Sequence, residues 1–365
     1  MLKLPWEQHK ISQIADRFDN LRVPVTASKR QKGSTPYYGA NGIQDYVNGY
    51  THDGEFLLIA EDGANDIRNY PVNYVNGKVW VNNHAHVIKG KANIANNLFL
   101  QYAFKSINIE SYLVGGGRAK LTAEVMMRLP IKLPSIEEQN KIGKLVHSLD
   151  DTITLHEEKQ RQLEQLKKAL LQKMFADKKE YPELRFNGFS DSWNKNKVSE
   201  LFTITRGYVL PAKDTKPTPE GDYCYPVYSS QTAQNGLMGY YNKYLYKDAI
   251  TWTTDGANAG TVRFRTGKFY CTNVCGVLLT KKAKASEMIA MALNKVTKKY
   301  VSYVGNPKLM NNVMGEIVIS LPTNTEEQNN LSFLFNNLER AIILTEHKIE
   351  QLKSLKQALL QQMFI

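Results

Sequence analysis

The chain has 365 residues, a formal net charge of +12 and three cysteines. This length allows two or three domains with hydrophobic cores, the charge points to a polyanionic partner, with nucleic acid ahead of a membrane surface, and the few cysteines argue against a disulfide framework and for a reducing compartment. No run of about 18 apolar residues is present, so no transmembrane helix is expected. The opening residues, MLKLPWEQHK, lack the apolar region of a signal peptide, and we expect a cytoplasmic protein without a membrane partner.

The first segment, residues 1–132, has short strand-like runs separated by turn signals, which predicts a globular domain. Residues 56–60 (FLLIA) predict a buried strand that ends in the turn EDGAN. Asn76-Gly77 predicts a hairpin before the short strand VWV, and the run AHVI continues the pattern. Residues 94–104 predict a short helix, and residues 129–133 predict the last strand of the domain.

Residues 133–175 predict one long helix that acts as a spacer. Ser135 can cap its first turn, where Glu137 and Glu138 complement the helix dipole. Apolar residues recur at heptad spacing through the segment. The heptad positions are Ile142, Leu149, Leu163 and Leu170, with Leu145, Ile153, Leu166 and Met174 in the intervening steps. At about 1.5 Å per residue such a helix is about 60 Å long, far longer than the helices of an average globular domain.

The second half of the chain repeats the first. A polar linker at residues 176–192 leads to a second globular domain at 193–320 and a second long helix at 321–365. About half of the aligned positions in the two helical segments are identical, which indicates an internal repeat. The heptad positions of the second copy are Leu331, Leu338, Leu352 and Leu359, with Leu334, Ile342, Leu355 and Met363 between them.

The globular domains share a frame but little else. The turn DGAN occurs at residues 62–65 and again at 255–258, Trp193 corresponds to Trp6, and Lys308 corresponds to Lys120. Between these anchors the sequences diverge, as where YYGANG in the first domain faces YSSQ in the second. This contrast predicts two domains with one fold and one mounting but with different binding surfaces.

The expected fold class is α+β, with two α/β domains related by a pseudo-twofold axis and separated by two long antiparallel coiled-coil helices. The alternative is that both helices belong to the core of a single domain. Polar residues interrupt the apolar seam at His156, Lys159, Thr345 and Lys348. Such residues can fix the register of paired helices, or their side chains can simply extend along the edge of the seam into water.

Motifs for catalysis are missing from the sequence. We find no GxxxxGK[ST] loop and no glycine-rich nucleotide fingerprint, and Asn306-Pro307-Lys308 lacks the aromatic residue of an adenine methyltransferase motif. Cys271 and Cys275 fit small apolar strand residues better than zinc ligands. His84 and His86 are predicted to share one strand face as hydrogen-bonding groups rather than metal ligands. We therefore assign no catalytic residue and no metal site.

Candidate DNA contacts fall into two classes. Exposed basic residues would grip phosphates, and we select Lys29, Arg30, Lys32, Arg118, Lys120, Arg206, Lys213, Arg263, Arg265 and Lys308. Polar groups on turns and strand ends would read bases, and we select Tyr38, Asn41, Asn65, Arg68, Asn83, Ser230, Gln231, Asn258 and Asn273. The alternative for each residue is a solvated surface or turn position. The two DGAN turns are more plausibly structural, because identical turns cannot distinguish two different half-sites.

The helix-entering pattern LPxxxEEQ, the endings QLKKALLQKMF and QLKSLKQALLQQMF, the linker PELRFNGFSDSW and the pattern YYGANGIQDYV…AEDGAN…VNNHAHV are found together here. This combination resembles the specificity subunit of type I restriction–modification enzymes, over nearly the whole chain. The resemblance implies a non-catalytic subunit in which each globular domain is a target recognition domain for half of a bipartite, asymmetric sequence in double-stranded DNA. It also implies that the helices set the gap and dock two modification (methyltransferase) subunits, with restriction subunits completing the complex.

The resemblance implies no cofactor in this chain, with S-adenosylmethionine, and ATP with magnesium, bound by the partner subunits. The alternative function is a non-catalytic RNA- or protein-binding scaffold with repeated helices, which the basic charge also permits.

Overall fold

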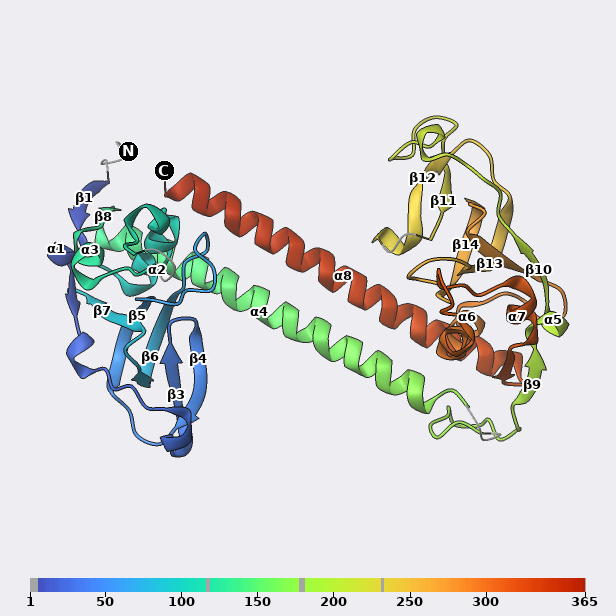
Figure 1. Ribbon diagram of the computed structural model, residues 1–365, viewed down its shortest axis with the longest axis horizontal. Helices are drawn as coiled ribbons and strands as arrows, with labels where there is room; N and C mark the ends of the chain where they lie inside the picture. The colour runs from blue at the N-terminus through green and yellow to red at the C-terminus, as the bar shows by residue number, and fades with distance from the viewer. Residues whose placement is uncertain (1–5, 116–118, 177–180, 231–232, 365) are drawn as a thin grey trace. The chain divides into compact units, whose positions relative to one another are not determined.

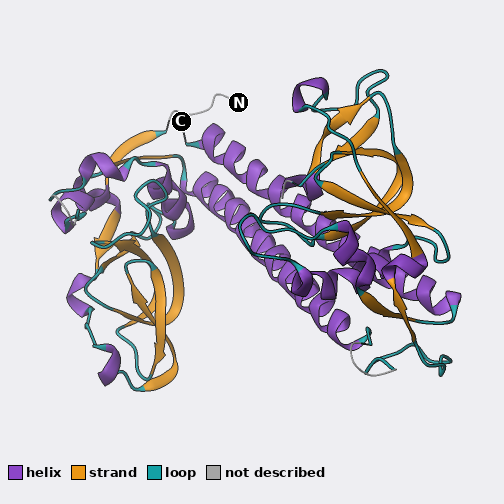
Figure 2. Cartoon of the chain, turned by 45° about the vertical axis from the view of Figure 1, so that its right-hand side comes forward, coloured by secondary structure: helices purple, strands orange, loops and turns teal. Residues whose placement is uncertain are grey.

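The computed structural model describes residues 6–115, 119–176, 181–230 and 233–364. The chain divides into two compact units, Met1–Glu157 with His347–Ile365, and Glu158–Glu346. Each unit combines a β-sheet with several short helices and with portions of the two long helices (Figures 1 and 2).

The two units have sheets of identical topology. Each contains a six-stranded mixed sheet, in the order β2-β7-β5-β6-β3-β4 in the first unit and β10-β15-β13-β14-β11-β12 in the second. The only parallel neighbours among these described strands are β3 with β6 and β11 with β14. The first sheet consists of β2 (Ala15–Arg17), β3 (Lys32–Gly39), β4 (Gly42–Val47), β5 (His52–Ala60), β6 (Val72–Val81) and β7 (Ala85–Gly90). The second consists of β10 (Phe202–Arg206), β11 (Tyr225–Tyr228), β12 (Leu237–Tyr241), β13 (Tyr246–Thr253), β14 (Val262–Cys271) and β15 (Cys275–Thr280).

A small two-stranded sheet joins each globular part to its long helix. It pairs β1 (Glu7–Lys10) with β8 (Pro130–Leu133) in the first unit, and β9 (Asn194–Lys197) with β16 (Val318–Leu321) in the second. The helices are α1 (Ile11–Ile14), α2 (Asn97–Ser106), α3 (Ala123–Arg128), α4 (Ile136–Lys173), α5 (Val198–Leu201), α6 (Glu287–Thr297), α7 (Asn311–Glu316) and α8 (Thr325–Met363). Both long helices are therefore present, and the predicted short helix at 94–104 begins three residues later than expected.

The β5–β6 ribbon is sharply bent. Val79 pairs with His52 at the start of β5, whereas Ala85 on β7 pairs with Ala60 at its end. An extended β5 spans about 26 Å between these two pairs, but the chain from 79 to 85 reaches at most about 21 Å, so the sheet must curl. Gly54 and Gly77 face each other in the ribbon with φ of 127° and 97°, a backbone conformation that favours glycine.

The prediction of a hairpin at Asn76-Gly77 is wrong, because these residues form the bend of the ribbon and not its end. Both residues lie inside β6, and the connection between β5 and β6 is the loop that follows Ala60. The second unit bends its β13–β14 ribbon by a similar device. Asp248 (φ 46°) and Gly267 (φ 71°) lie on the two strands, and the Gly267 N–H donates to the Asp248 carboxylate at 2.7 Å.

Along α4 and α8 the non-exposed positions include lines with alternating spacings of three and four residues, as in a coiled-coil seam. On α4 this line is Gln139, Ile142, Val146, Leu149, Ile153, His156, Gln160, Leu163, Lys167 and Leu170, and Met174 continues it just past the end of the helix. On α8 it is Leu331, Phe335, Leu338, Ile342, Thr345, Ile349, Leu352, Lys356, Leu359 and Met363. His156 and Thr345 thus lie among these non-exposed positions, and the Thr345 hydroxyl donates to the Ala341 carbonyl at 2.7 Å.

Some of the predicted intervening seam positions are wrong, because the residue that is not exposed is the next one in the chain. Leu145, Leu166 and Leu355 are 46–49% exposed. Lys159 and Lys348 are also exposed, while Gln160 and Ile349 take the seam positions beside them. For each of the three leucines the seam residue is the next one in the chain: Val146, which is buried, and Lys167 and Lys356, which are half-buried.

Within each unit the two long helices run antiparallel and are joined by ion pairs. In the first unit Lys356 pairs with Asp150, and Lys353 pairs with Glu157 at 2.6 Å. In the second unit Lys167 pairs with Glu339. Aligning the two helical repeats places Asp150 over Glu339 and Lys167 over Lys356, so one ion pair is preserved in both units with its donor and acceptor helices exchanged.

The C-terminal end of each long helix completes a core. Phe364, just past α8, packs edge-on against Trp6 at 5.7 Å and beside Phe99 at 5.2 Å between ring centroids, in the first unit. Its repeat counterpart, Phe175 past α4, packs against Trp193 and Phe335 in the second unit. The core of the globular part in each unit therefore includes side chains far away in sequence.

The start of each long helix explains the LPxxxEEQ-type pattern, which has three residues between Pro322 and Glu326 but two between Pro134 and Glu137. Ser135 caps α4 as predicted, because its hydroxyl accepts from the Glu138 N–H at 3.3 Å. The glutamine of the pattern ties the helix to the preceding proline: Gln139 Nε2 donates to the Pro134 carbonyl at 2.9 Å, and Gln328 Nε2 donates to the Pro322 carbonyl at 2.8 Å.

Candidate nucleic-acid interface

Several predicted base readers of the first unit come together on one surface, which we call the first loop face. It is formed by the β3–β4 turn with Asn41, the residues after β5 from Asp62 to Asn65, the β6–β7 turn with Asn83 and His84, and Lys120. The Asn41 side chain links two of these segments, because its amide donates to the Gly63 carbonyl and its oxygen accepts from the Asn65 N–H, both at 2.9 Å. Asn65 and Asn83 have exposed side chains.

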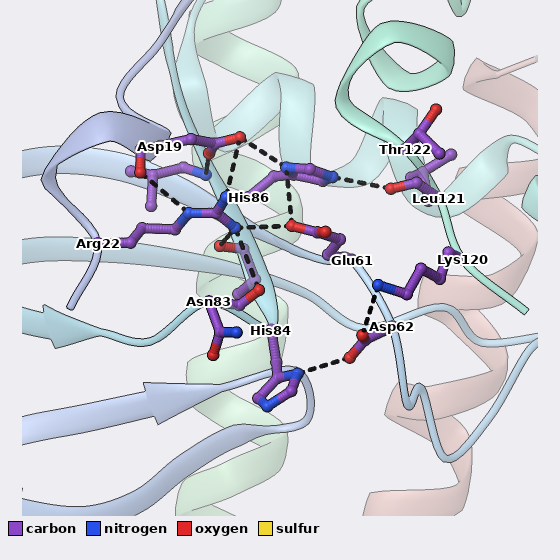
Figure 3. Close-up of polar contacts among 12 residues, drawn as sticks. Asp19, Arg22, Glu61, Asp62, Asn83, His84, His86, Lys120, Leu121 and Thr122 are labelled. Atoms are coloured by element: carbon purple, nitrogen blue, oxygen red, sulfur yellow. Dashed lines mark hydrogen bonds and ion pairs between the residues drawn. The ribbon is translucent and has the colours of Figure 1, made fainter. Parts of the chain in front are cut away.

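Asp62 holds two further parts of this surface together. Its carboxylate is 2.6 Å from Nδ1 of His84 and 3.2 Å from Nζ of Lys120 (Figure 3). The Asp62 side chain is 7% exposed, whereas those of His84 and Lys120 are 38% and 46% exposed. The DGAN turn is therefore anchored through Asp62, which holds His84 and Lys120, while the Asn65 side chain of the same turn is exposed.

A buried network of charged groups supports the first loop face from below (Figure 3). His86 on β7 contacts the Asp19 carboxylate through Nδ1 at 2.7 Å and the Leu121 carbonyl through Nε2 at 2.8 Å. Arg22 donates to Glu61 at 2.8 Å and to the carbonyls of Asn83 and Ala85, and so fixes both sides of the β6–β7 turn.

Burial alone would raise the pKa of Asp19, but the pKa is lowered. The hydrogen bond with His86 and the backbone N–H of Val87 favour the ionised carboxylate, and the charges of His86 and Arg22 add to this effect. The negative charge is therefore a permanent part of the network at neutral pH.

The second unit has a corresponding surface, the second loop face, formed by Ser230, the turn from Asp255 to Asn258, Asn273 and Lys308. The Asn258 amide donates to the Ser230 carbonyl at 3.0 Å. Lys308 pairs with Asp255 at 3.7 Å, which repeats the pair of Lys120 with Asp62. The structure thus brings together predicted residues of the second unit as it does in the first, and the amides of Asn41 and Asn258 link segments of these surfaces.

The two units support their loop faces with different chemistry. In the pairing register, Gly276 on β15 takes the position that His86 has on β7. Trp252 fills the space beside Gly276, because an added Cβ there would lie 2.1 Å from the indole ring. The Trp252 Nε1 donates to the Leu309 carbonyl at 3.1 Å. In the first unit, His86 Nε2 makes the corresponding contact with the equivalent Leu121 carbonyl. A histidine on one strand is thus replaced by a tryptophan on the neighbouring strand.

Other predicted phosphate contacts lie elsewhere. Lys29, Arg30 and Lys32 are at or before the start of β3, about 20 Å along that strand from the Asn41 turn. Lys213 lies in the corresponding short helical turn of the second unit. Arg30 is not an exposed grip, because its guanidinium stacks 4.1 Å from the Tyr37 ring centroid and donates to the Val25 carbonyl.

Arg265 also contradicts the expectation of exposure. It is 9% exposed, stacks 3.6 Å from the Tyr228 ring centroid and donates to Thr251 and to the Asn235 carbonyl. Burial lowers the pKa of its guanidinium. With Arg263, which is half-buried, it lines a polar cavity of about 120 Å³.

The remaining predicted residues divide into three groups. Arg206 and Arg68 have exposed side chains. Tyr38 is half-buried against the small core beneath the sheet, where burial raises its pKa. Arg118 and Gln231 lie outside the described residues.

The prediction that His84 and His86 share one strand face is wrong. His84 lies in a turn rather than on a shared strand face with His86, and the two rings bind different carboxylates, those of Asp62 and Asp19. Cys271 and Cys275 are buried strand residues, and burial raises the pKa of the Cys275 thiol to about 11. Within the described ranges no cluster of three or more potential metal ligands is found.

Sequence reasoning missed His84 as a member of the loop face. Its only signal was its place directly after Asn83, between a strand and a turn. It also missed Asp19 and Arg22, which lie far from His86 in sequence and carry no motif. In the part of the chain that the structure describes, no helix is both long and apolar enough to cross a membrane.

Comparison with known proteins agrees with this architecture. The family described as type I restriction modification DNA specificity domain matches residues 3–165 and 190–354. A putative type I restriction enzyme specificity subunit of Haemophilus influenzae is 45% identical over 143 residues, which are 39% of this chain and 37% of that protein. The N-terminal part of a putative type I specificity subunit of Mycoplasma pneumoniae is 40% identical over 124 residues, which are 33% of this chain and 65% of that protein.

The chain thus matches less than two thirds of the length of each of these two relatives. The crystal structure of a type I restriction–modification system S subunit from M. genitalium has a TM-score of 0.80 with 14% identity, and covers 100% of this chain and 97% of that one. This likeness shows a shared fold. Because the family match covers most of both halves of the chain, the protein belongs to the family of type I restriction–modification specificity subunits.

Proposed function

We propose that this chain is the non-catalytic DNA-reading subunit of a type I restriction–modification complex, and that it recognises a bipartite, asymmetric sequence in double-stranded DNA. Each loop face reads one half-site. The observation that carries the proposal is one fold that occurs twice with different side chains on equivalent surfaces. Two identical readers would favour a symmetric target, whereas two different readers on one chain suit an asymmetric one.

The net charge of +12 supports this assignment, because a basic protein gains affinity for DNA by releasing counterions from phosphates. Exposed lysines border both loop faces, and the asparagine side chains beside them are of the type that pairs with adenine in the major groove. Lys120 and Lys308 would contact the backbone, and Asn83 and Asn273 would contact bases.

The long helices would set the gap between half-sites and dock two methyltransferase subunits. Repeat-equivalent leucines support a duplicated docking surface: Leu155 and Leu344 are 68% and 59% exposed, and Leu166 and Leu355 are 48% and 49% exposed. Large apolar residues in matching exposed positions support the proposal that the same kind of partner covers both copies. The partners would supply catalysis, with S-adenosylmethionine in the methyltransferase and ATP with magnesium in the restriction subunits.

A domain exchange tests the assignment of half-sites. Residues 1–132 are replaced by the equivalent segment of another family member, and the methylated motif is determined by single-molecule sequencing in cells that express all subunits. We expect one half-site to change and the other to persist. The matched control replaces residues 193–320 and should change the other half-site. If either exchange altered both half-sites, or neither, the proposed division of labour would be wrong.

An insertion tests the spacer. One heptad added to both α4 and α8 at repeat-equivalent positions keeps the seam in register and lengthens the helices by about 10 Å, or about three base pairs of DNA. We expect the unread gap to widen by about that amount while both half-sites are kept. An unchanged gap would contradict a ruler function.

A further inference from the structure

His84 has the geometry of a contact residue, although the fold does not require it. The ring is held at one nitrogen, because Nδ1 lies 2.6 Å from the Asp62 carboxylate. The backbone N–H of His84 donates to the Asn82 side chain at 2.8 Å, so the residue is fixed at both ends. No partner for Nε2 is found among the described residues, and the side chain is 38% exposed.

The carboxylate behind the ring is itself nearly buried and is shared. Asp62 pairs with Lys120 as well as with His84, so two side chains that reach the surface flank one carboxylate. When the imidazole is protonated, this cluster has a surplus of positive charge on the first loop face. The hydrogen bond that the ring donates from Nδ1 to this buried carboxylate also orients the ring, in the way that outer partners orient histidines in other sites.

The second unit shows that the loop face folds without this histidine. Val274 takes the position of His84 in the β14–β15 turn, between Asn273 and Cys275. The anchoring pair of lysine and aspartate is kept there, and the Thr254 hydroxyl donates to the Asp255 carboxylate at 2.6 Å in addition. An imidazole at this place is therefore an addition to the first loop face and not a part of the shared frame.

We propose that His84 is a DNA contact of the first loop face alone, and that its protonated imidazole donates from Nε2 to an acceptor atom of the duplex. The acceptor is a backbone phosphate oxygen or a base acceptor in the groove, and both have the same hydrogen-bonding chemistry. The inference rests on the proposed DNA-reading function. The contact adds a pH dependence to that function, because binding of the first half-site then takes up a proton and binding of the second does not.

The sign of the pH dependence follows from the charges around the ring. Asp62 and Lys120 face His84 directly, and Arg22, Glu61, Asp19 and His86 lie in the network on the inner side of the turn. Histidine side chains gain their charge between pH 8 and pH 5. If DNA binding favours the charged ring, affinity must rise as pH falls, by at most tenfold per pH unit for one proton.

The test compares the full complex carrying wild-type chain with the complex carrying His84→Val, the residue that the second unit has at this position. The probe is a duplex with the bipartite motif identified by methylation sequencing, and dissociation constants are measured from pH 6 to pH 8 at constant ionic strength. We expect the substitution to weaken binding about threefold to tenfold at pH 6 and much less at pH 8. His9→Val on β1 is the matched control, and should leave the affinity and its pH dependence unchanged.

A second variant, Asp62→Asn, keeps the shape of the anchor but removes the carboxylate that holds the ring, and should also weaken binding of the bipartite duplex at pH 6. Duplexes with single base changes in the first half-site separate the two acceptors: a phosphate contact weakens all of them equally, and a base contact removes discrimination at one position. If His84→Val binds the wild-type duplex with the affinity and pH dependence of the wild-type chain, the inference is overturned. If the wild-type complex does not prefer this duplex over a scrambled one, the proposed function itself fails.

Discussion

The packing of Phe364 against the first unit makes a specific prediction about stability. Phe364 is half-buried and contacts Trp6 and Phe99 through its ring. Truncating a fully buried phenylalanine to alanine costs about 3–5 kcal/mol. Because Phe364 is only half-buried, we expect about half of this cost, about 1.5–2.5 kcal/mol, for Phe364→Ala, and this value includes the two lost aromatic contacts.

Two matched substitutions set the scale. Phe175→Ala removes the repeat counterpart, which is 4% exposed, and should cost about 3–5 kcal/mol in the second unit. Phe333→Ala removes a ring that is 71% exposed and should change the free energy of unfolding by less than about 0.5 kcal/mol. All three changes have the same chemistry, so they differ only in burial.

Urea unfolding of the full chain gives the free energies, and amide hydrogen exchange locates the loss. For Phe364→Ala we expect faster exchange in α2 and β1 of the first unit, and unchanged protection in α6 of the second unit. A free energy within about 0.5 kcal/mol of the wild-type value, with unchanged exchange in α2, would refute the claim that the end of α8 completes the first core.

Three further substitutions test individual contacts. Trp252→Phe leaves the buried Leu309 carbonyl without its donor and should cost about 1–3 kcal/mol in urea unfolding, and no measurable loss would contradict the contact. Glu327→Gln breaks the bidentate pair with Arg185, whose distances are 2.6 and 2.8 Å, and should cost about 3 kcal/mol, whereas a cost near zero would exclude a buried ion pair there. Because the pKa of Asp19 is lowered, its stabilisation is present above its ordinary value of 3.8 and is lost as pH falls through the lower folded-state value. Asp19→Asn should therefore lose less stability than wild type between pH 5 and pH 3, and equal losses would show that Asp19 contributes nothing to the acid sensitivity.

The repeated architecture could be predicted from the sequence because the long helices have a periodic pattern of apolar residues and the two halves of the chain are similar in sequence. The seam was assigned correctly at positions such as Ile142, Leu149 and Leu170, where apolar residues coincide with the line of non-exposed side chains. The register failed where leucines are exposed, as at Leu166, because the sequence does not distinguish a leucine that faces another helix from one that faces a partner or solvent.

The supports of the loop faces could not be predicted. The network of Asp19, Arg22 and His86 depends on contacts between segments that only the curled sheet brings together. The exchange of His86 for Trp252 is even less visible, since the compensating residue lies on a different strand. Polar candidates such as Asn41 were found because turns favour asparagine, but the sequence does not tell whether the amide is used for the fold or remains available to DNA.

The most direct test of the account is the set of methylated bases in cells with and without the gene for this chain, with the partner subunits expressed in both. Single-molecule sequencing should find one bipartite, asymmetric motif that is methylated only when the chain is present. If every methylated motif persisted unchanged after deletion of the gene, the chain would not be the reader of the target, and the central claim would be wrong.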